Sequence, residues 1–299
     1  MPFSCSSIRL CHHIHSKSAV VRRMGVLRQA KWRRDELGEI LVKGREQIEN
    51  VLRSTATTRF RDILISDRNG DHEFIQSLGL AAKRLHRVDS RVLYQIVYQS
   101  RPLRGQMGDA GEGLDILHDA GVSDSLMLGT LPMPRFSFPN EPKFLLCLDG
   151  VIFPENVGSL IRSAAAVGGI DGILATSGTC DFYGWKVLES SKCLGFTLPK
   201  FRLKSTEELV GLIQEHNLLP VVGNANSGIR PSELDLGTHK GVVLIVGNEK
   251  HGPSKQIADL AVQVRIPIEN TNSLNAGVAG GLLMQLVKAS PAAAFSNTL

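Results

Sequence analysis

The stretch Phe144–Gly169, FLLCLDGVIFPENVGSLIRSAAAVGG, decides the fold because it holds a strand, a loop and a helix in that order. FLLCLD is apolar almost throughout, which is typical of a strand buried on both faces of a sheet. From about Asn156 to Val167 the apolar residues recur at helical spacing. A buried strand followed at once by a helix predicts the α/β class.

The same alternation continues through the second half of the chain. We expect further strands at residues 172–176, 196–201, 218–223, 242–247 and 262–267. We expect helices from Phe182, near Thr206–His216, after Pro253 and over Ser273–Val287. Apolar strands alternating with helices imply a parallel sheet that is covered on both faces.

The first half predicts a smaller αβαβα domain that ends in the glycine- and proline-rich segment between Arg101 and Pro142. The glycines of GQMGDAGEG, residues 105–113, are interpreted as a flexible loop. The elements expected before it are a helix from Leu37 to about Arg53, a strand at Arg61–Ser66, a helix at Asp71–Leu78, an ambiguous segment at Ala81–Leu85 and a helix at Asp89–Tyr98 with Asp89 as its N-cap.

Positive charge is concentrated at the start of the chain. The formal net charge is +5, but residues 1–34 carry eight Lys and Arg and no acidic residue, whereas the rest carries 26 against 29 Asp and Glu. The total charge therefore gives no argument for RNA binding. The Arg-, Ser- and His-rich segment 1–34 suits an organellar transit peptide, and a basic arm that stays attached is the alternative. We see no periodic apolar face in residues 1–34, so a chain that starts near Asp35 is expected to fold and to be as active as the full chain.

Several classes of protein are excluded by the sequence. The five cysteines are widely spaced and form no CxxC, which indicates reduced thiols and no structural metal. No apolar run approaches the roughly 20 residues that cross a bilayer, so no membrane partner is expected.

Three polar loops follow apolar runs: Asp149–Gly158, Gly247–Ser254 and Ile266–Asn275. Ligands of open parallel sheets bind at the carboxyl ends of the strands, so these loops are the candidate site. The second loop nearly fits the phosphate loop GxxxxGK[ST], but Pro253 stands at the lysine position and disfavours a nucleotide triphosphatase.

Each loop also has a simple structural explanation. Asn156 and Ser273 could be N-caps, and Arg162 could be an ordinary surface residue. The last predicted helix contains glycines that cost about 1 kcal/mol each in helix propensity, which predicts close packing of its backbone. These glycines are Gly277, Gly280 and Gly281.

Together the loops resemble the three motifs of the SpoU (TrmH-like) branch of the SPOUT RNA 2′-O-ribose methyltransferases. ENVGSLIRSAAAVGG is similar to the N-x-G…R motif, VVLIVGNEKHGPS to the GNE motif and VRIPIENTNSLNAGVA to the IP…SLN motif. The resemblance covers about residues 143–289. It implies a parallel sheet with a C-terminal trefoil knot, S-adenosylmethionine bound by backbone of the knot loops, and a homodimer whose interface completes each site.

The resemblance also implies roles for individual residues. The catalytic and substrate positions are Asn156, Arg162, Glu249, Ser273 and Asn275, and the cofactor positions are Gly247, Ile266 and Leu274. Arg162 would lie by the ribose hydroxyl and help to remove or stabilise its proton, while Glu249 and Asn156 hold Arg162 and the ribose. In LESSKCLGFTLP, which resembles the family's S-x-G stretch, Ser191 matches the serine and Cys193 stands where glycine is usual.

The first half resembles, more weakly, the small ribosomal-protein-like RNA-recognition domain often fused before this catalytic domain. The expected divisions are a transit peptide at 1–34, an RNA-recognition domain at 35–130, a linker at 131–142 and a SPOUT methyltransferase domain at 143–290. The candidate phosphate contacts are Arg59, Arg61, Arg68, Lys83, Arg84 and Arg87, with ordinary solvated charges as the alternative.

The resulting hypothesis is 2′-O-ribose methylation of structured RNA with S-adenosylmethionine as cofactor. Large-subunit rRNA is favoured over tRNA, and a mitochondrial location over a chloroplast. The alternatives are a tRNA 2′-O-ribose methyltransferase and a non-catalytic RNA-binding or ribosome assembly factor. A small-molecule α/β enzyme is disfavoured because no GxGxxG follows the first strand.

Overall fold

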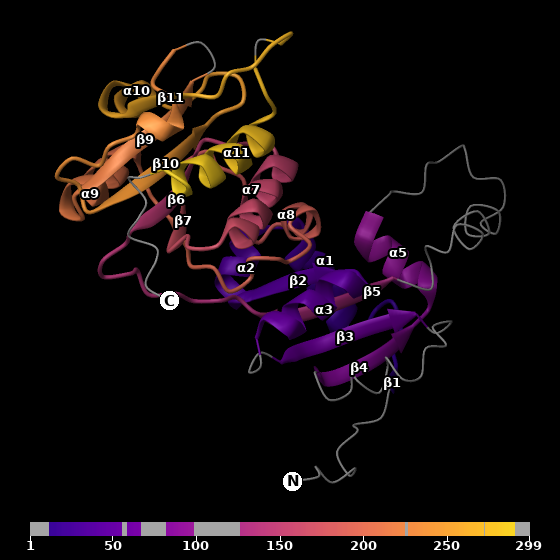
Figure 1. Ribbon diagram of the computed structural model, residues 1–299. Coiled ribbons are helices and arrows are strands. Elements are labelled where there is room, and N and C mark those ends of the chain that lie inside the picture. Colours follow the sequence, from indigo (N-terminus) through magenta and orange to yellow (C-terminus); the bar gives the residue numbers. More distant parts are fainter. Residues whose placement is uncertain are drawn as a thin grey trace, which may run out of the picture. The chain divides into compact units, whose positions relative to one another are not determined.

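The computed structural model describes residues 12–55, 59–66, 82–98, 126–224, 227–271 and 273–290. Its internal contacts divide the chain into two compact units, and each has its own sheet (Figure 1). The first unit comprises Met1–Pro134 with Tyr183–Glu189, and the second comprises Arg135–Phe182 with Ser190–Leu299.

The second unit is built on a six-stranded sheet in which every pair of neighbours is parallel. The strand order is β11-β9-β10-β6-β7-β8. Its strands are β6 (Phe144–Asp149), β7 (Gly172–Ala175), β8 (Lys200–Arg202), β9 (Leu218–Asn224), β10 (Gly241–Gly247) and β11 (Val262–Arg265). The strands predicted at 144–149, 172–176, 218–223, 242–247 and 262–267 are thus confirmed to within two residues, whereas the one predicted at 196–201 begins only at Lys200, after a turn.

Helices cover both faces of this sheet (Figure 1). Ile245 of β10 belongs to a core cluster with Leu209 and Ile257 of two helices, while Val246 lies under the last helix beside Gly280. Successive strand residues point to opposite faces, so these helices lie on opposite sides. The helices of this unit are α7 (Pro154–Val167), α9 (Thr206–Glu215), α10 (Lys255–Leu260) and α11 (Ala276–Lys288), with a 3₁₀ turn at Pro231–Glu233. All of α8 (Trp185–Ser190) except Ser190 belongs to the first unit.

The first unit contains a mixed five-stranded sheet in the order β1-β4-β3-β5-β2. β3 pairs in parallel with β4 and antiparallel with β5, and β5 pairs antiparallel with β2. The strands are β1 (His12–His13), β2 (Glu39–Lys43), β3 (Phe60–Ser66), β4 (Ala82–Val88) and β5 (Met127–Pro132). The helices are α1 (Ala19–Gln29), α2 (Lys31–Leu37), α3 (Arg45–Ser54) and α5 (Ser90–Tyr98).

Two predictions in this unit are wrong. Glu39–Lys43 forms strand β2 and not the first turns of the predicted helix, which begins only at Arg45. Ile40, Leu41 and Val42 are all buried. A short apolar run of this kind is compatible with a strand or a helix. Here it forms a strand because it pairs with β5. β5 itself was not predicted, and it carries the first unit's sheet to Pro132, inside the linker expected at 131–142.

Other predictions here are confirmed or fall outside the described residues. β3 and α5 lie where expected, and the Asp89 carboxylate accepts a hydrogen bond from Arg91 N at 2.7 Å. The helix predicted at Asp71–Leu78 and the GQMGDAGEG segment are outside the described residues.

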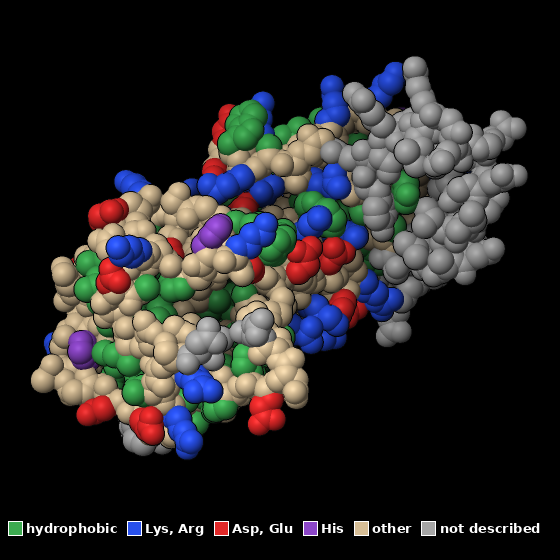
Figure 2. All heavy atoms as spheres, turned by 90° about the horizontal axis from the view of Figure 1, so that it is seen from above, with side chains coloured by type: hydrophobic (Ala, Val, Ile, Leu, Met, Phe, Trp, Pro, Cys, Tyr) green, Lys and Arg blue, Asp and Glu red, His purple; other side chains and the backbone are tan. Residues whose placement is uncertain are grey.

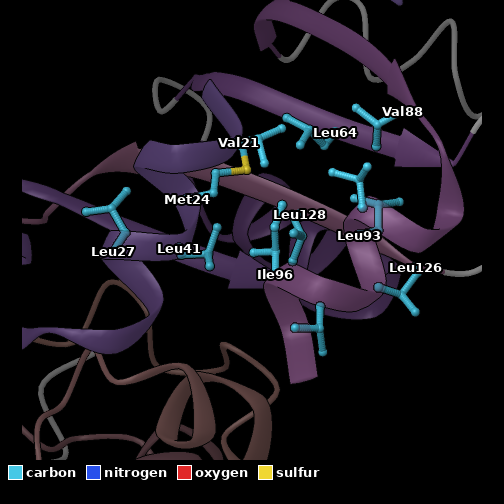
Figure 3. Close-up of a cluster of buried hydrophobic side chains, with 12 residues drawn as sticks. Val21, Met24, Leu27, Leu41, Leu64, Val88, Leu93, Ile96, Leu126 and Leu128 are labelled. Atoms are coloured by element: carbon cyan, nitrogen blue, oxygen red, sulfur yellow. The ribbon is translucent and has the colours of Figure 1, made fainter. Parts of the chain in front are cut away.

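The expectation that residues 1–34 join no core is also wrong. α1 places Val21, Met24 and Leu27 in a cluster of buried side chains with Leu64 of β3 and Leu93 of α5 (Figure 3). Its Arg residues obscured an apolar face with helical spacing. A cleavable leader stays a prediction, but it would have to end before Ala19 for this core to remain intact.

Three expectations of absence can be set beside the described residues. None of their helices is long and apolar enough to span a bilayer. They contain no group of three or more His, Cys, Asp or Glu that could hold a metal ion. Cys147, Cys180 and Cys193 are free thiols, as predicted, whereas Cys5 and Cys11 lie outside the described part of the chain.

Candidate active site

A pocket of about 670 Å³ opens at the carboxyl ends of β9, β10 and β11 in the second unit. β10 pairs with β6 in a register that sets Gly247 opposite Asp149, so the loops after these two strands start side by side. The loop after β11 forms the remaining wall. The three polar loops singled out in the sequence therefore meet at one place, as the parallel topology predicts.

Seven of the eight predicted site residues line this pocket. They are Asn156, Gly247, Glu249, Ile266, Ser273, Leu274 and Asn275. Three loops that are distant in sequence supply them, which is the strongest geometric support for a shared function.

A chain of side-chain hydrogen bonds connects the three loops. Asn275 Nδ2 donates to Asn156 Oδ1 at 2.8 Å, and Asn156 Nδ2 donates to Glu249 Oε1 at 2.8 Å. Asn156 is only 6% exposed, so its amide is oriented by these two partners within the protein. Because each amide both donates and accepts, the chain fixes which way the two asparagine side chains face.

The simple structural explanation of Asn156 and Ser273 as N-caps is wrong. α7 begins at Pro154 with Phe153 as N-cap, so Asn156 lies inside the first turn. α11 is capped by Asn275, whose Oδ1 accepts from Gly277 N at 2.9 Å and Val278 N at 3.2 Å. Asn275 thus has two roles, because one amide end caps α11 and the other holds Asn156.

Glu249 binds the entrance of α7. Its carboxylate accepts from Ile152 N at 3.3 Å and from Phe153 N at 3.4 Å, in addition to Asn156. A negative charge near a helix N-terminus is favoured by the helix dipole. Glu249 therefore joins the loop after β10 to α7.

Arg162 is the one predicted site residue that the structure does not bring to the pocket. It is exposed and makes no hydrogen bond or ion pair with any described residue, Glu249 included. It shares the outer face of α7 with Glu155, which lines the pocket, but lies two turns, or about 10 Å, further along the axis. The expectation that Glu249 and Asn156 hold Arg162 of their own chain is therefore wrong.

Two residues that sequence reasoning did not single out shape the loops. Asn248 Nδ2 donates to Gly150 O at 2.8 Å, while its Oδ1 accepts from Lys250 N and His251 N. The Asp149 carboxylate accepts from Thr176 Oγ1 and from Ser254 N, both at 2.7 Å. A polar residue at the last position of an apolar strand, as at Asp149, was the available signal.

The pocket residues fit an elongated ligand with both apolar and polar parts. The volume falls in the 300–1,000 Å³ range of cofactor sites, and Ile266, Ile268 and Leu274 supply apolar walls. At Gly247 an added Cβ would overlap the backbone of Gly252 and Pro253, so the loop there closes tightly on its own main chain.

The stretch around Cys193 explains why glycine suits this position. Cys193 has φ of 55°, in the left-handed region that favours glycine, and its side chain is 1% exposed. Burial raises the pKa of the Cys193 thiol to about 12, so it is not a nucleophile at neutral pH.

The glycines of α11 pack closely, as predicted, but within the chain. At Gly280 an added Cβ would overlap Leu160 of α7 and lie 3.0 Å from Val246 of β10, and at Gly277 it would lie 2.9 Å from Ser159 Cβ. Gly280 therefore packs against α7 and β10 of its own chain and is not available to a second subunit.

Comparison with known proteins gives a consistent picture. Residues 143–285 match the SpoU rRNA Methylase family. The 23S rRNA (adenosine(1067)-2'-O)-methyltransferase of Streptomyces laurentii is 31% identical over 142 residues, which are 47% of this chain and 52% of that protein. The chain spans about half the length of the curated relatives it matches.

Solved structures resemble both units. The SpoU methyltransferase AviRb from Streptomyces viridochromogenes, in complex with AdoMet, has a TM-score of 0.71 at 21% identity over 91% of this chain and 98% of that chain. An AdoMet-bound rRNA methyltransferase from Sinorhizobium meliloti has a TM-score of 0.70 at 21% identity over 93% and 97%. At this identity they show the fold, namely an N-terminal α/β unit followed by a parallel-sheet methyltransferase unit. The trefoil knot stays a prediction.

Proposed function

We propose that this chain, whose residues 143–285 match the SpoU rRNA Methylase family, transfers a methyl group from S-adenosylmethionine to a ribose 2′-hydroxyl of rRNA. The observation that carries the proposal is the Asn275–Asn156–Glu249 chain at the rim of a cofactor-sized pocket. The N-terminal unit, which carries its own basic site, supports a structured RNA as the substrate.

Apolar side chains and loop backbone would hold S-adenosylmethionine. Ile266, Ile268 and Leu274 would offer it apolar surface, and Gly247 would leave room for it to approach the main chain of the loop. When bound, this cofactor supplies an electrophilic methyl group on a sulfonium sulfur. The polar chain lies at one side of the same pocket, where it can orient a ribose.

The residues at the pocket must handle one proton, because a hydroxyl loses its proton when its oxygen takes up a methyl group. Glu249 and Asn156 are held by hydrogen bonds to each other and to the entrance of α7, so we assign them to positioning. Arginine keeps its proton at any ordinary pH. Arg162 would therefore stabilise the negative charge that develops on the ribose oxygen. The hydroxyl proton would pass to solvent water as the oxygen takes up the methyl group and the sulfonium becomes a neutral thioether.

A second copy of the chain would bring Arg162 to the pocket. α11 carries an exposed apolar stripe of Val278, Leu282 and Leu286, which are 53%, 44% and 40% exposed. These residues are spaced by four and share one face of the helix. α11 packs against α7, so the stripe lies on the same two-helix layer as Arg162. We assign this layer to a homodimer in which the partner subunit's Arg162 completes each pocket.

Methyl transfer to RNA is the direct test of this function. Wild-type protein with labelled S-adenosylmethionine should label large-subunit rRNA in a form that resists alkaline cleavage at one position, since a 2′-O-methyl group blocks that cleavage. Arg162→Ala and Arg162→Lys should both lose the activity while binding the cofactor within a few-fold of wild type, because one ammonium does not reproduce the planar guanidinium. Substantial activity in either variant would remove Arg162 from the mechanism.

Mixing two inactive variants tests the shared site. Arg162→Ala and Asn156→Ala homodimers should each be inactive, but a heterodimer keeps one pocket with an intact Asn156 and an intact Arg162 from its partner. Co-refolding equal amounts should restore about a quarter of wild-type activity, because half of the dimers are mixed and each has one intact site. No recovery in a mixture shown to contain heterodimers would place both residues in the same subunit's site.

The non-catalytic alternative makes the opposite prediction. A binding or assembly factor would bind RNA without transferring the label. The intact polar chain at the pocket disfavours it, since an assembly factor has no need of it.

A further inference from the structure

A shallow basic site lies in the first unit, at the end of the sheet where β3 and β4 begin. It has a volume of about 390 Å³, and four of its six lining residues are cationic. These are Arg59, Arg61, Lys83 and Arg84. All four were candidate phosphate contacts from the sequence, whereas Arg87 is not among the residues that line this site and Arg68 is outside the described residues.

Two of these cations are held in place by buried carboxylates. Arg84 Nε and Nη2 donate to the two oxygens of Asp62 at 2.7 and 2.8 Å, and Arg61 Nη1 donates to Glu39 Oε1 at 2.6 Å. Asp62 and Glu39 are 1% and 6% exposed, whereas the Arg61 and Arg84 side chains are 42% and 46% exposed. The two buried carboxylates therefore fix the positions of the guanidinium groups, and each guanidinium has further N–H donors for a ligand.

The register of the strands creates this arrangement. Asp62 of β3 lies directly opposite Arg84 of β4, which allows the two-fold hydrogen bond between neighbouring strands. His86 Nε2 contacts the same carboxylate at 3.0 Å from two residues further along β4. Burial alone would raise the pKa of Asp62, but the hydrogen bonds and charges of His86 and Arg84 outweigh it and lower the pKa.

The other two cations have no such partner. Arg59 and Lys83 are exposed, and neither makes a hydrogen bond or ion pair within the part of the chain that the structure describes. Glu39 also contacts Arg23 of α1. Among the described residues this site therefore has five cations and two carboxylates, a local excess of three positive charges. The cations are Arg23, Arg59, Arg61, Lys83 and Arg84, and the carboxylates are Glu39 and Asp62.

This local excess differs from the charge balance of the chain beyond residue 34. Positive and negative side chains are interspersed over the face drawn in Figure 2, and the chain beyond residue 34 has slightly more acidic than basic residues. A concentration of cations in a concave site, with two of them prearranged, is what a phosphate group requires.

We propose that this cradle of Arg59, Arg61, Lys83 and Arg84 binds phosphate groups of the RNA backbone. Its RNA partner rests on the proposed function, but its binding does not depend on turnover. Contacts of this type position an RNA without distinguishing its sequence. The cradle therefore anchors a stem of the substrate, while the pocket of the second unit selects the ribose.

The test uses the full chain with Arg59→Gln and Lys83→Gln combined, since neither side chain has a hydrogen-bond or ion-pair partner among the residues that the structure describes. Arg91→Gln is the matched control, because Arg91 is an exposed cation of the same unit with no carboxylate partner among the described residues, and it follows the far end of β4. Lys83 and Arg91 are separated by most of that strand, about 15 Å or more. Two labelled RNA stem-loops of unrelated sequence serve as probes, and anisotropy gives the dissociation constant at several salt concentrations.

The double variant should bind both stem-loops more weakly by the same factor. Each lost phosphate contact lowers the slope of log affinity against log salt by about 0.9, so the loss of affinity between about 50 and 200 mM salt should shrink roughly tenfold relative to wild type. The control should keep the wild-type slope. Thermal unfolding should be the same for all three proteins.

Unchanged slope in the double variant, or an equal change in the control, would overturn the cradle. A loss confined to one stem-loop would also overturn it, because phosphate contacts are blind to sequence. Labelled methyl transfer by the wild type is measured on the same RNA. Methyl transfer by the wild type with an unchanged salt slope in the double variant would refute the cradle and leave the proposed function standing. A lowered slope in the double variant without methyl transfer by the wild type would support the cradle and refute the proposed function.

Discussion

Substitution of Leu27 by alanine tests whether α1 is part of the folded protein or a removable leader. Leu27 is fully buried and packs in the cluster drawn in Figure 3. Val26 is the matched control, because it is the neighbouring residue of the same helix and is 38% exposed. A leader that joins no core would tolerate both substitutions equally.

The expected magnitude follows from burial. A buried Leu→Ala change costs about 3 to 5 kcal/mol through lost apolar burial and the cavity that remains. At a urea dependence of about 1.5 kcal/mol per M, a loss of about 3 kcal/mol lowers the unfolding midpoint by about 2 M. The Val26→Ala control should shift it by less than about 0.5 M, since exposed substitutions change stability little.

Tryptophan fluorescence isolates the relevant transition. The chain has two tryptophans, Trp32 and Trp185, and both fall within the first unit. Their emission therefore reports unfolding of that unit and not of the parallel sheet. Equal midpoints for Leu27→Ala and Val26→Ala would refute the core role of α1. Deletion of residues 1–34 should be more damaging still, because it removes Val21 and Met24 as well.

Three further predictions concern the second unit and the base of the cradle. Gly280→Ala should be about 1 to 3 kcal/mol less stable in urea unfolding than the control Gly211→Ala. Both variants gain helix propensity, but an added Cβ at Gly280 overlaps Leu160 and lies close to Val246, whereas one at Gly211 has nothing within 4 Å. Equal stabilities would contradict the close packing of α11. Asn275→Asp should keep the stability of α11, since a carboxylate still caps it, yet lose most methyl transfer because it cannot donate to Asn156; Asn275→Ala, the comparison, should lose both. Asp62 has a lowered pKa in the folded protein, so its contribution to the free energy of unfolding is present above its ordinary pKa near 4 and is lost as the pH falls through the folded value. The stability difference between wild type and Asp62→Asn should therefore shrink below about pH 4. A difference that grows there would contradict the lowered pKa.

The second unit could be predicted from the sequence because its strands are continuous apolar runs. β6 and β10 are buried along almost their whole length on both faces, so the pattern depends little on which strand lies beside them. The first unit is different, since Ile40–Val42 suits a helix until β5, some 90 residues later, pairs with it. α1 had a local signal in the N-cap of Ser18, whose Oγ accepts from Val21 N, but its arginines suggested a leader.

The candidate site shows the same division between what is local and what is not. Seven of the predicted residues line one pocket because they lie at or after strand ends, and parallel strands bring such ends together. Their hydrogen bonds could not be predicted, and neither could the distance of Arg162 from the pocket. The hydrogen bonds depend on how the three loops pack against one another, and Arg162 is remote because it lies two turns along α7 from the pocket-lining Glu155. A motif specifies neither position in space.

α7 is the element on which the site and the fold depend together. Its buried side carries Asn156, which hydrogen-bonds Glu249, and Leu160, which packs beside Gly280. Its outer side carries Arg162. Partners of Asn156 lie 93 and 119 residues further along the chain, so the polar chain forms only when β10 and α11 are in place. A shift of α7 caused by bulk at Gly280 would therefore move Asn156 away from Glu249 and Arg162 out of register with a second subunit. It follows that activity should fall before the second unit unfolds, and that loss of activity at Gly280 need not mean loss of the dimer.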